Sequence, residues 1–171
     1  NVSTDNRYNL YLDGKLLGRG PCRSDLAHYN YETYNIDIIP GKHVLSAEVA
    51  VFYQGNRKDN GPIGEVHAGG GFIVAGGVFG GDAKLVSLDT PGDWRCAIDS
   101  SRTLVRRKDC PVTGYLAIVQ NECVDFSRAL CPGWKIPGYD ASGWASPETI
   151  EPAVFSGNME NAWSRWWLTA R

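Results

Sequence analysis

The sequence predicts an all-β fold, most simply a jelly roll or a related β-sandwich. Short strand-like runs alternate with turn signals at roughly ten-residue spacing, which is typical of sandwiches and barrels. The 20 glycines and 9 prolines interrupt the chain often, whereas 6 tryptophans, 8 tyrosines and 5 phenylalanines favour pleated surfaces. No long amphipathic helical pattern is present, which argues against a helical bundle.

The first predicted element is a β-hairpin. Residues 7–12 alternate polar and apolar side chains, which is the period of a half-buried strand. Asp13-Gly14 follows directly and supplies the positive φ angles that a two-residue hairpin turn requires. The chain is therefore expected to return as a strand over residues 15–18. Residues 19–25 are too polar and too broken for regular structure and predict a loop.

The remaining strands are predicted from apolar and β-branched runs bounded by turn residues. They cover residues 29–36, 43–52, 72–75, 84–88, 94–98, 115–119 and 163–168. The glycine-dense residues 76–82 predict a long hairpin end. Residues 122–128 fit either a strand or an irregular crossing, and residues 139–144 fit a single helical turn.

Length and charge narrow the classes of protein. A chain of 171 residues suits one domain over residues 1–171, because two halves would each have a marginal core. A net charge of −2 gives no reason to expect nucleic acid or an anionic membrane as partner. No apolar run approaches the roughly 20 residues of a membrane span. The start lacks a Met and a signal-peptide pattern, so we expect a piece of a longer protein or a processed product.

Cysteine spacing leaves two alternatives open. The five cysteines are Cys22, Cys96, Cys110, Cys123 and Cys131. They form no CxxC pair, and the three histidines are not spaced as their partners, so no structural zinc site is expected. If the protein is exported, one or two disulfides would form within residues 96–131; free cysteines in a β core are the alternative.

Three blocks near the start of the chain form one motif, with DNRY at residues 5–8, LYLDGK at 10–15 and GRGP at 18–21. Together they resemble the D-N-R-Y-x-L-Y-V-N-G-K…G-R-G-P segment of the β-sandwich domains that accompany α-L-rhamnosidase catalytic domains. Asp25, His28 and YETY at 31–34 are similar to the family's D-x-x-H-x-x-Y-E-T-Y, and PGK at 40–42 to its P-G-K.

Later residues continue the resemblance, with GW at 133–134 and PGYDASGW at 137–144 similar to the family's G-W…P-G-F-D-D-S-x-W. The similarity covers nearly the whole chain and is weakest over residues 54–81. It implies a galactose-binding-domain-like sandwich that lacks the one or two strands preceding Asp5 in the family. WLTAR at 167–171 lies where the family runs into its next domain.

The resemblance implies a sugar contact at Asp5 and Asn6, because the corresponding pair binds L-rhamnose hydroxyls with help from calcium in some family members. A carboxylate accepts hydroxyl protons, and an amide both donates and accepts. The alternative is a polar strand entry whose side chains cap a turn. Asp5, Asn6 and Asn56 are the calcium candidates, although the Asn that the family places after the long central strand is absent here.

A second candidate sugar-binding group lies in the loop after the hairpin, where Arg19, Arg23, Asp25 and His28 gather beside tyrosines. These side chains would form a polar pocket rim with aromatic faces for sugar stacking. Alternatively, Arg19 and Asp25 form an internal salt bridge that fixes the loop.

Catalysis by this chain is not expected. A glycosidase needs two carboxyl groups about 5–10 Å apart across the scissile bond. The spacing of Glu32, Asp37, Glu65 and Asp125 shows no such pair. In the family that this chain resembles, the catalytic acids lie in a separate helical barrel domain. Most of the six tryptophans are expected in the core or in contacts between domains, since each supplies a large buried area.

These observations predict a non-catalytic accessory domain of an α-L-rhamnosidase-like glycoside hydrolase. It would bind L-rhamnose or a similar sugar, brace the catalytic domain of its parent chain, or do both. The alternatives are a purely structural spacer without ligand and a free-standing lectin-like domain. The expected partners are a rhamnose-containing glycan and the catalytic domain, and an extracellular or periplasmic location is favoured over a cytoplasmic one.

Overall fold

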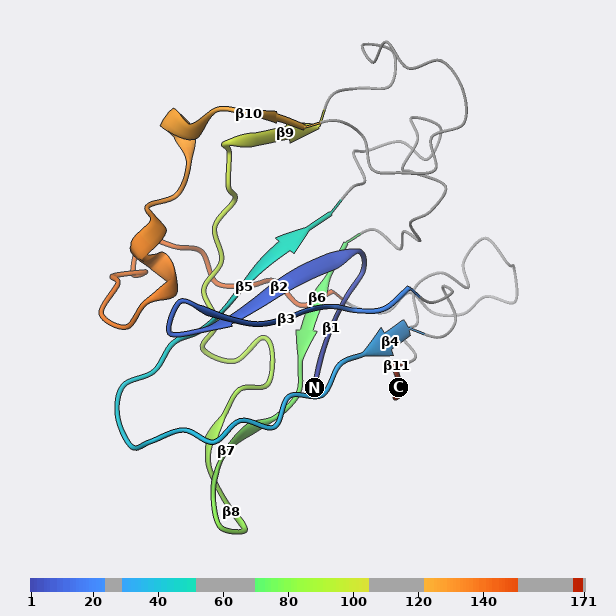
Figure 1. Ribbon diagram of the computed structural model, residues 1–171, viewed down its shortest axis with the longest axis vertical. Coiled ribbons are helices and arrows are strands. Elements are labelled where there is room, and N and C mark those ends of the chain that lie inside the picture. Colours follow the sequence, from blue (N-terminus) through green and yellow to red (C-terminus); the bar gives the residue numbers. More distant parts are fainter. Residues whose placement is uncertain (24–28, 52–69, 105–121, 151–167, 171) are drawn as a thin grey trace.

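The computed structural model describes residues 1–23, 29–51, 70–104, 122–150 and 168–170, and within them the chain is all-β (Figure 1). The strands are β1 (Val2–Thr4), β2 (Arg7–Leu12), β3 (Lys15–Gly20), β4 (Tyr29–Tyr31), β5 (Leu45–Ala50), β6 (Phe72–Val74), β7 (Gly77–Gly80), β8 (Ala83–Ser87), β9 (Arg102–Leu104), β10 (Glu122–Val124) and β11 (Leu168–Ala170). The helical elements of the described ranges are two 3-10 turns, η3 (Phe126–Arg128) and η4 (Pro132–Lys135). The predicted all-β class is confirmed.

The largest sheet is antiparallel, with strand order β3-β2-β5. Its β2–β3 hairpin is the one predicted from the sequence, and β2 spans the predicted residues. The turn residues Asp13 and Gly14 have φ angles of 51° and 80°, as the Asp-Gly pair requires. The register shifts between Leu10 and Tyr11, so a β-bulge adds one residue to β3 at this point.

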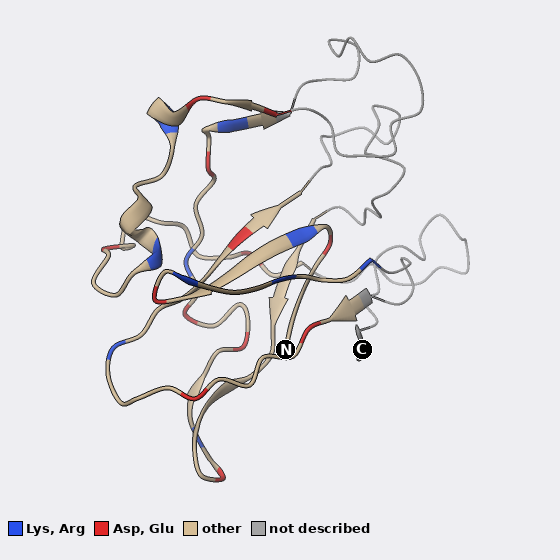
Figure 2. Ribbon diagram, viewed as in Figure 1, with Lys and Arg blue, Asp and Glu red and all other residues tan. Residues whose placement is uncertain are grey.

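Smaller sheets surround this one. The pairs β1–β6, β7–β8 and β9–β10 are antiparallel, and β4–β11 is parallel. In Figure 1 the β7–β8 hairpin projects from one end of the molecule and β9–β10 lies at the opposite end. Both charge signs are scattered along the described ribbon, with no segment of one sign (Figure 2).

The core lies where β1 and β6 pack on the inner face of β2. Val2, Tyr8, Leu10 and Val74 are its buried members. Phe72 extends this core, because its ring meets Tyr8 edge-on at 6.1 Å and Trp94 edge-on at 5.9 Å. Burial of each such side chain contributes roughly 1.5–3 kcal/mol. Strands β1, β2 and β6 therefore share one core, and Trp94 packs against it, in line with the core position expected for most tryptophans.

Two glycines of β3 explain the Gly-Arg-Gly motif. A Cβ at Gly18 would lie 2.6 Å from the Tyr34 hydroxyl, and a Cβ at Gly20 would lie 2.7 Å from the Tyr8 hydroxyl. These two hydroxyls are 3.1 Å apart and share a hydrogen bond. The motif therefore lets two tyrosines cross β3 at close range. Because side chains alternate along a strand, Arg19 between the glycines points to the other face.

Several local predictions were wrong. Residues 94–98 form no strand and hold only one isolated bridge, between Cys96 and Ala145. Residues 76–82 do hold the predicted hairpin end, but the turn is only residues 81–82, because Gly77–Gly80 form β7, which pairs with β8. The helical turn predicted at 139–144 is a simple turn closed by Trp144 N–H and the Ala141 carbonyl at 3.0 Å, and the helical turn is η4 instead.

Other predictions are refined or lie outside the described residues. β4 covers only three residues of the predicted 29–36, and residues 122–128 divide into β10 and η3. Strands β1 and β9 were not predicted. The predicted strand at 115–119 and residues 163–167 lie outside the described part of the chain.

Free thiols are found at the four cysteines that the structure describes, Cys22, Cys96, Cys123 and Cys131. The sequence left open disulfides or free cysteines, and these four cysteines are free. They do not all lie in a β core, because Cys96, Cys123 and Cys131 are exposed. Cys110 lies outside the described residues.

Candidate functional site

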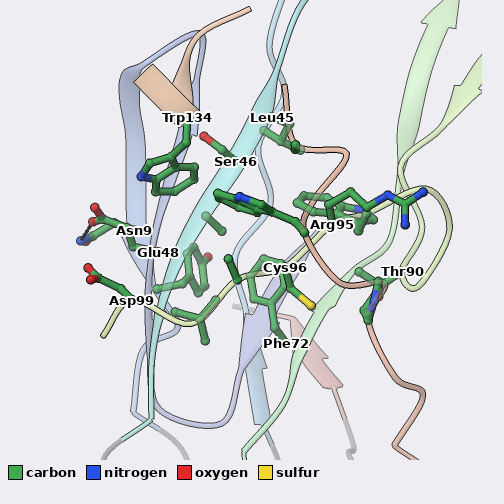
Figure 3. A pocket seen from close by; sticks show the side chains of 18 of the residues that line it. Asn9, Leu45, Ser46, Glu48, Phe72, Thr90, Arg95, Cys96, Asp99 and Trp134 are labelled. Atoms are coloured by element: carbon green, nitrogen blue, oxygen red, sulfur yellow. Dashed lines mark hydrogen bonds between the residues drawn. The ribbon is translucent and has the colours of Figure 1, made fainter. Parts of the chain in front are cut away.

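A cleft of about 2050 Å³ runs along β5, at the edge of the β3-β2-β5 sheet, and is bordered by residues 88–99 and 130–150. Its lining combines aromatic side chains, such as Trp134 and Trp144, with polar ones, such as Asn9, Glu48 and Asp99. Figure 3 shows Asn9, Glu48 and Asp99 gathered at one side of the cleft, with Trp134 beside them. This mixture of aromatic walls and a few polar groups is typical of a ligand site.

Strand register brings the polar groups of the cleft together. Asn9 on β2 lies opposite Glu48 on β5 and, on its other side, opposite Arg19 on β3. Directly opposed residues of antiparallel strands share a face, so these three side chains form one polar row across the sheet. Asn9 Nδ2 donates a hydrogen bond to Glu48 Oε2 at 3.0 Å, and the Tyr11 hydroxyl donates to the same oxygen at 2.7 Å.

The η4 turn completes this polar row from outside the sheet. Pro132 opens the turn, where a proline is favoured because it has no N–H to satisfy. The turn places Lys135 so that its Nζ donates to Glu48 Oε1 and lies 4.0 Å from the centre of the Tyr11 ring. The same Nζ lies 5.1 Å from the centre of the Trp134 ring.

We call Asn9, Tyr11, Glu48, Trp134 and Lys135 the Glu48 cluster. Trp134 is held in place by Trp144, at a ring distance of 5.8 Å, and Tyr139 packs on Trp144 at 5.7 Å. The aromatic rings therefore form a small supported wall next to the charged pair.

Electrostatics fix the protonation states in the cluster. Burial opposes ionisation of Glu48, but hydrogen bonds from Lys135, Asn9 and Tyr11 outweigh it and hold the pKa of Glu48 below its usual range. Burial also opposes the charge on Lys135, yet its bond to Glu48 holds the pKa of Lys135 above its usual range. The cluster therefore carries a carboxylate and an ammonium at neutral pH.

Two further groups bear on the chemistry of the cleft. Ser46, opposite Tyr11 in the ladder, is 6% exposed, and its hydroxyl has no hydrogen-bond partner among the residues that the structure describes. Asp99 accepts a hydrogen bond from the Ser101 N–H at 2.9 Å, and the bonds from Ser101 hold the pKa of Asp99 below its usual range. Both carboxyl groups, Glu48 and Asp99, are therefore ionised.

The predicted pair Asp5 and Asn6 is buried, at 4% and 5% exposure. Asp5 Oδ2 accepts a hydrogen bond from the Gly70 N–H at 2.7 Å, and the Asp5 N–H donates to the Gly71 carbonyl at 3.0 Å. These bonds tie the end of β1 to the start of β6. The pair therefore has contacts within the chain, and a sugar contact there stays a prediction.

The predicted loop site is described only in part. Arg19 is exposed and lines the cleft, in the same row as Glu48. Arg23 is exposed beyond the end of β3, where its carbonyl accepts from Asn30 Nδ2 at 3.1 Å. Asp25 and His28 lie outside the described residues, so neither the pocket rim nor the Arg19–Asp25 salt bridge is tested.

The calcium candidates are also described only in part. Asp5 and Asn6 are described, whereas Asn56 lies outside the described residues. Among the residues that the structure describes, no group of three or more His, Cys, Asp or Glu side chains could hold a metal ion. Calcium at this position therefore stays a prediction.

Sequence reasoning missed the Glu48 cluster. Part of the signal was present, because the predicted strands at 7–12 and 43–52 place Asn9 and Tyr11, and Ser46 and Glu48, at alternate positions. What the pattern could not give was Lys135, which lies 87 residues from Glu48 in the chain.

Comparison of the chain with protein-family models, with curated proteins and with solved structures found no match. Within the described ranges, no helix is long and apolar enough to span a membrane. Any statement of function therefore depends on the motifs of the chain and on the geometry of the cleft.

Proposed function

We propose that this chain is a non-catalytic accessory domain of an α-L-rhamnosidase-like glycoside hydrolase, with a jelly-roll or galactose-binding-like sandwich. We place its site for L-rhamnose or a similar sugar in the cleft beside Glu48. The sequence motifs support the family, and the cleft supports the binding of a neutral, hydroxyl-rich ligand. The Glu48 cluster is the observation that carries this proposal.

The chemistry of the cluster suits a sugar. An ionised carboxylate accepts hydroxyl protons, an amide donates and accepts, and a guanidinium donates, which matches a ring of vicinal hydroxyls. Glu48, Asn9 and Arg19 supply these groups in one row. The supported Trp134 adds an apolar face against which the C–H side of a sugar can pack.

Binding is favoured over hydrolysis by the state of the two carboxyl groups. A glycosidase needs one carboxylic acid that is still protonated at its working pH, and this requires a raised pKa. The pKa values of Glu48 and Asp99 are both shifted downward, so neither is suited to be a general acid.

A structural role in bracing a neighbouring domain is the second candidate. It is favoured by the β7–β8 hairpin, where Phe79 and Leu85 are exposed. Large apolar side chains on a projecting hairpin are typical of surfaces that contact another protein.

Calorimetric titration with L-rhamnose tests the proposal, with calcium and again with chelator. We expect heat of binding at sugar concentrations up to about 50 mM, which corresponds to a weak affinity. Glu48→Ala should lower the affinity about tenfold or more, since a hydrogen bond to a charged group is worth roughly 1.5–3 kcal/mol. The matched control is Asp82→Ala, which removes a carboxylate from the β7–β8 turn and should bind like the wild type.

The outcomes separate the candidates. If no titration gives heat of binding, the sugar-binding proposal is wrong and a purely structural spacer domain remains. Binding that survives Glu48→Ala but is lost in a folded Asp5→Ala variant would move the site to Asp5 and Asn6. Hydrolysis of p-nitrophenyl α-L-rhamnoside by this chain alone would overturn the non-catalytic proposal.

A further inference from the structure

We propose that His43 is a pH-operated clasp that joins the irregular segment of residues 35–44 to the turn of the β2–β3 hairpin. His43 Nδ1 lies 2.7 Å from Asp13 Oδ2, and His43 Nε2 lies 2.8 Å from the Ile39 carbonyl oxygen. Both partners are acceptors. A neutral imidazole has one N–H and can satisfy only one of them, whereas the imidazolium donates to both.

The clasp acts on a turn that already organises the central sheet. Asp13 Oδ1 accepts from the Val44 N–H at 2.8 Å, and the Asp13 N–H donates to the Val44 carbonyl at 3.0 Å. The second carboxylate oxygen holds His43. Asp13 therefore links the hairpin turn both to the start of β5 and to the segment before it.

The segment has little else to fix its tip. Ile39 is 77% exposed, so it gains almost nothing from burial. The bond from His43 Nε2 to the Ile39 carbonyl joins two residues four apart and closes the Pro40-Gly41 bend. Loss of this bond would free the tip without disturbing the core around Leu10.

Of the charged groups near the ring, Asp13 favours the imidazolium. Asp13 contacts it from the turn, and Lys42 precedes it in the chain. The backbone carbonyl of Lys135 borders the turn at Gly14, but the Lys135 ammonium is bound to Glu48. The bond to Asp13, followed by the bond to Ile39, raises the pKa of His43, and the bond from His43 lowers the pKa of Asp13.

The sign of the effect follows from these directions. The stabilisation from His43 is fully present below its ordinary pKa of 6.5 and is lost as pH rises through the higher pKa of the folded state. The stabilisation from Asp13 is present above its ordinary pKa of 3.8 and is lost as pH falls through its lowered pKa. The clasp is therefore closed in mildly acidic solution and opens on the alkaline side. The clasp depends only on the contacts of His43 and Asp13, although His43 also lines the cleft of the proposed sugar site.

NMR measures the clasp in two ways. Titration of the imidazole resonances, assigned with His28→Gln and His67→Gln variants, gives the pKa of His43. Exchange of the Val44 amide, expressed as a protection factor, gives the stability of the junction. We expect protection to fall roughly two- to tenfold as His43 deprotonates, which corresponds to one lost hydrogen bond.

The variants make the proposal falsifiable. His43→Gln keeps one donor and cannot titrate, so its Val44 protection should no longer change between pH 5 and pH 9. Asp13→Asn should return the His43 pKa toward its ordinary value. A His43 pKa at or below 6.5 in the wild type, or the same pH dependence of Val44 protection in His43→Gln, would overturn the clasp.

Discussion

Gly18→Ala is the sharpest test of the packing around the central sheet. The added methyl would lie 2.6 Å from the Tyr34 hydroxyl and 2.7 Å from Tyr34 Cε1. Both distances are shorter than any ordinary carbon contact, so either β3 or the Tyr34 ring must move. If the ring moves, the 3.1 Å hydrogen bond between Tyr34 and Tyr8 is lost.

The expected change in the free energy of unfolding combines two destabilising contributions and one stabilising contribution. Overpacking of a well-packed site costs about 1–3 kcal/mol. Loss of the tyrosine hydrogen bond adds about 0.5–1.5 kcal/mol. The lower entropy of alanine in the unfolded chain returns about 0.4–1 kcal/mol. The free energy of unfolding should therefore fall by about 1–4 kcal/mol.

Urea denaturation followed by circular dichroism measures the change, and the midpoint should shift without a change in slope. Gly143→Ala is the matched control, because no atom lies within 4 Å of its added Cβ, and its stability should stay within about 0.5 kcal/mol of the wild type. In a Tyr34→Ala background, Gly18→Ala should cost little. A Gly18→Ala protein as stable as the wild type, or an undiminished cost in that background, would refute the reasoning.

Two other predictions concern the core and the thiols. Leu10→Ala should lower the free energy of unfolding, measured in urea, by about 2–5 kcal/mol. Leu10 is 1% exposed, so truncation of its side chain leaves a cavity in the core. The exposed thiols of Cys96, Cys123 and Cys131 should react with Ellman's reagent in the folded protein without reductant, whereas the half-buried Cys22 should react more slowly. Thiols that react only after reduction would show disulfides instead.

The part of the fold that could be predicted from sequence is the part set by local rules. The alternation over β2 and the Asp-Gly turn specify the hairpin without outside contacts, because a positive φ is costly for most residues and a one-residue slip would expose Leu10. β5 was predicted for the same reason, since an alternating run of apolar and β-branched residues over 43–52 follows a Pro-Gly bend.

The remaining elements depend on contacts that no local pattern encodes. β1 is three residues long and becomes a strand because β6 pairs with it. β7 is rich in glycine, a poor strand former, yet it pairs with β8 across a tight turn. Residues 94–98 have strand-like composition, but Trp94 is drawn to the core while Cys96 bridges Ala145, so no ladder forms.

The same distinction applies to the candidate site. Arg19 was predicted in the loop after the hairpin, but it lies on β3, in the row with Asn9 and Glu48. The flanking glycines admit tyrosines on one face of β3 and leave the arginine on the other. Lys135 and Trp134 join that row only through the η4 turn, which the sequence did not place.

For the proposed sugar site, the two candidate positions, Asp5 with Asn6 and the Glu48 cluster, differ in what a sugar must displace in order to bind. At Asp5 and Asn6, a sugar would have to compete with the Gly70 N–H for the Asp5 carboxylate and reach side chains that are almost fully buried. At Glu48, a sugar would compete with side-chain bonds from Asn9, Tyr11 and Lys135, but the carboxylate and the Trp134 wall border an existing cleft. A preorganised site loses less conformational freedom when it binds. For a weak ligand such as a monosaccharide, this difference favours the Glu48 cluster.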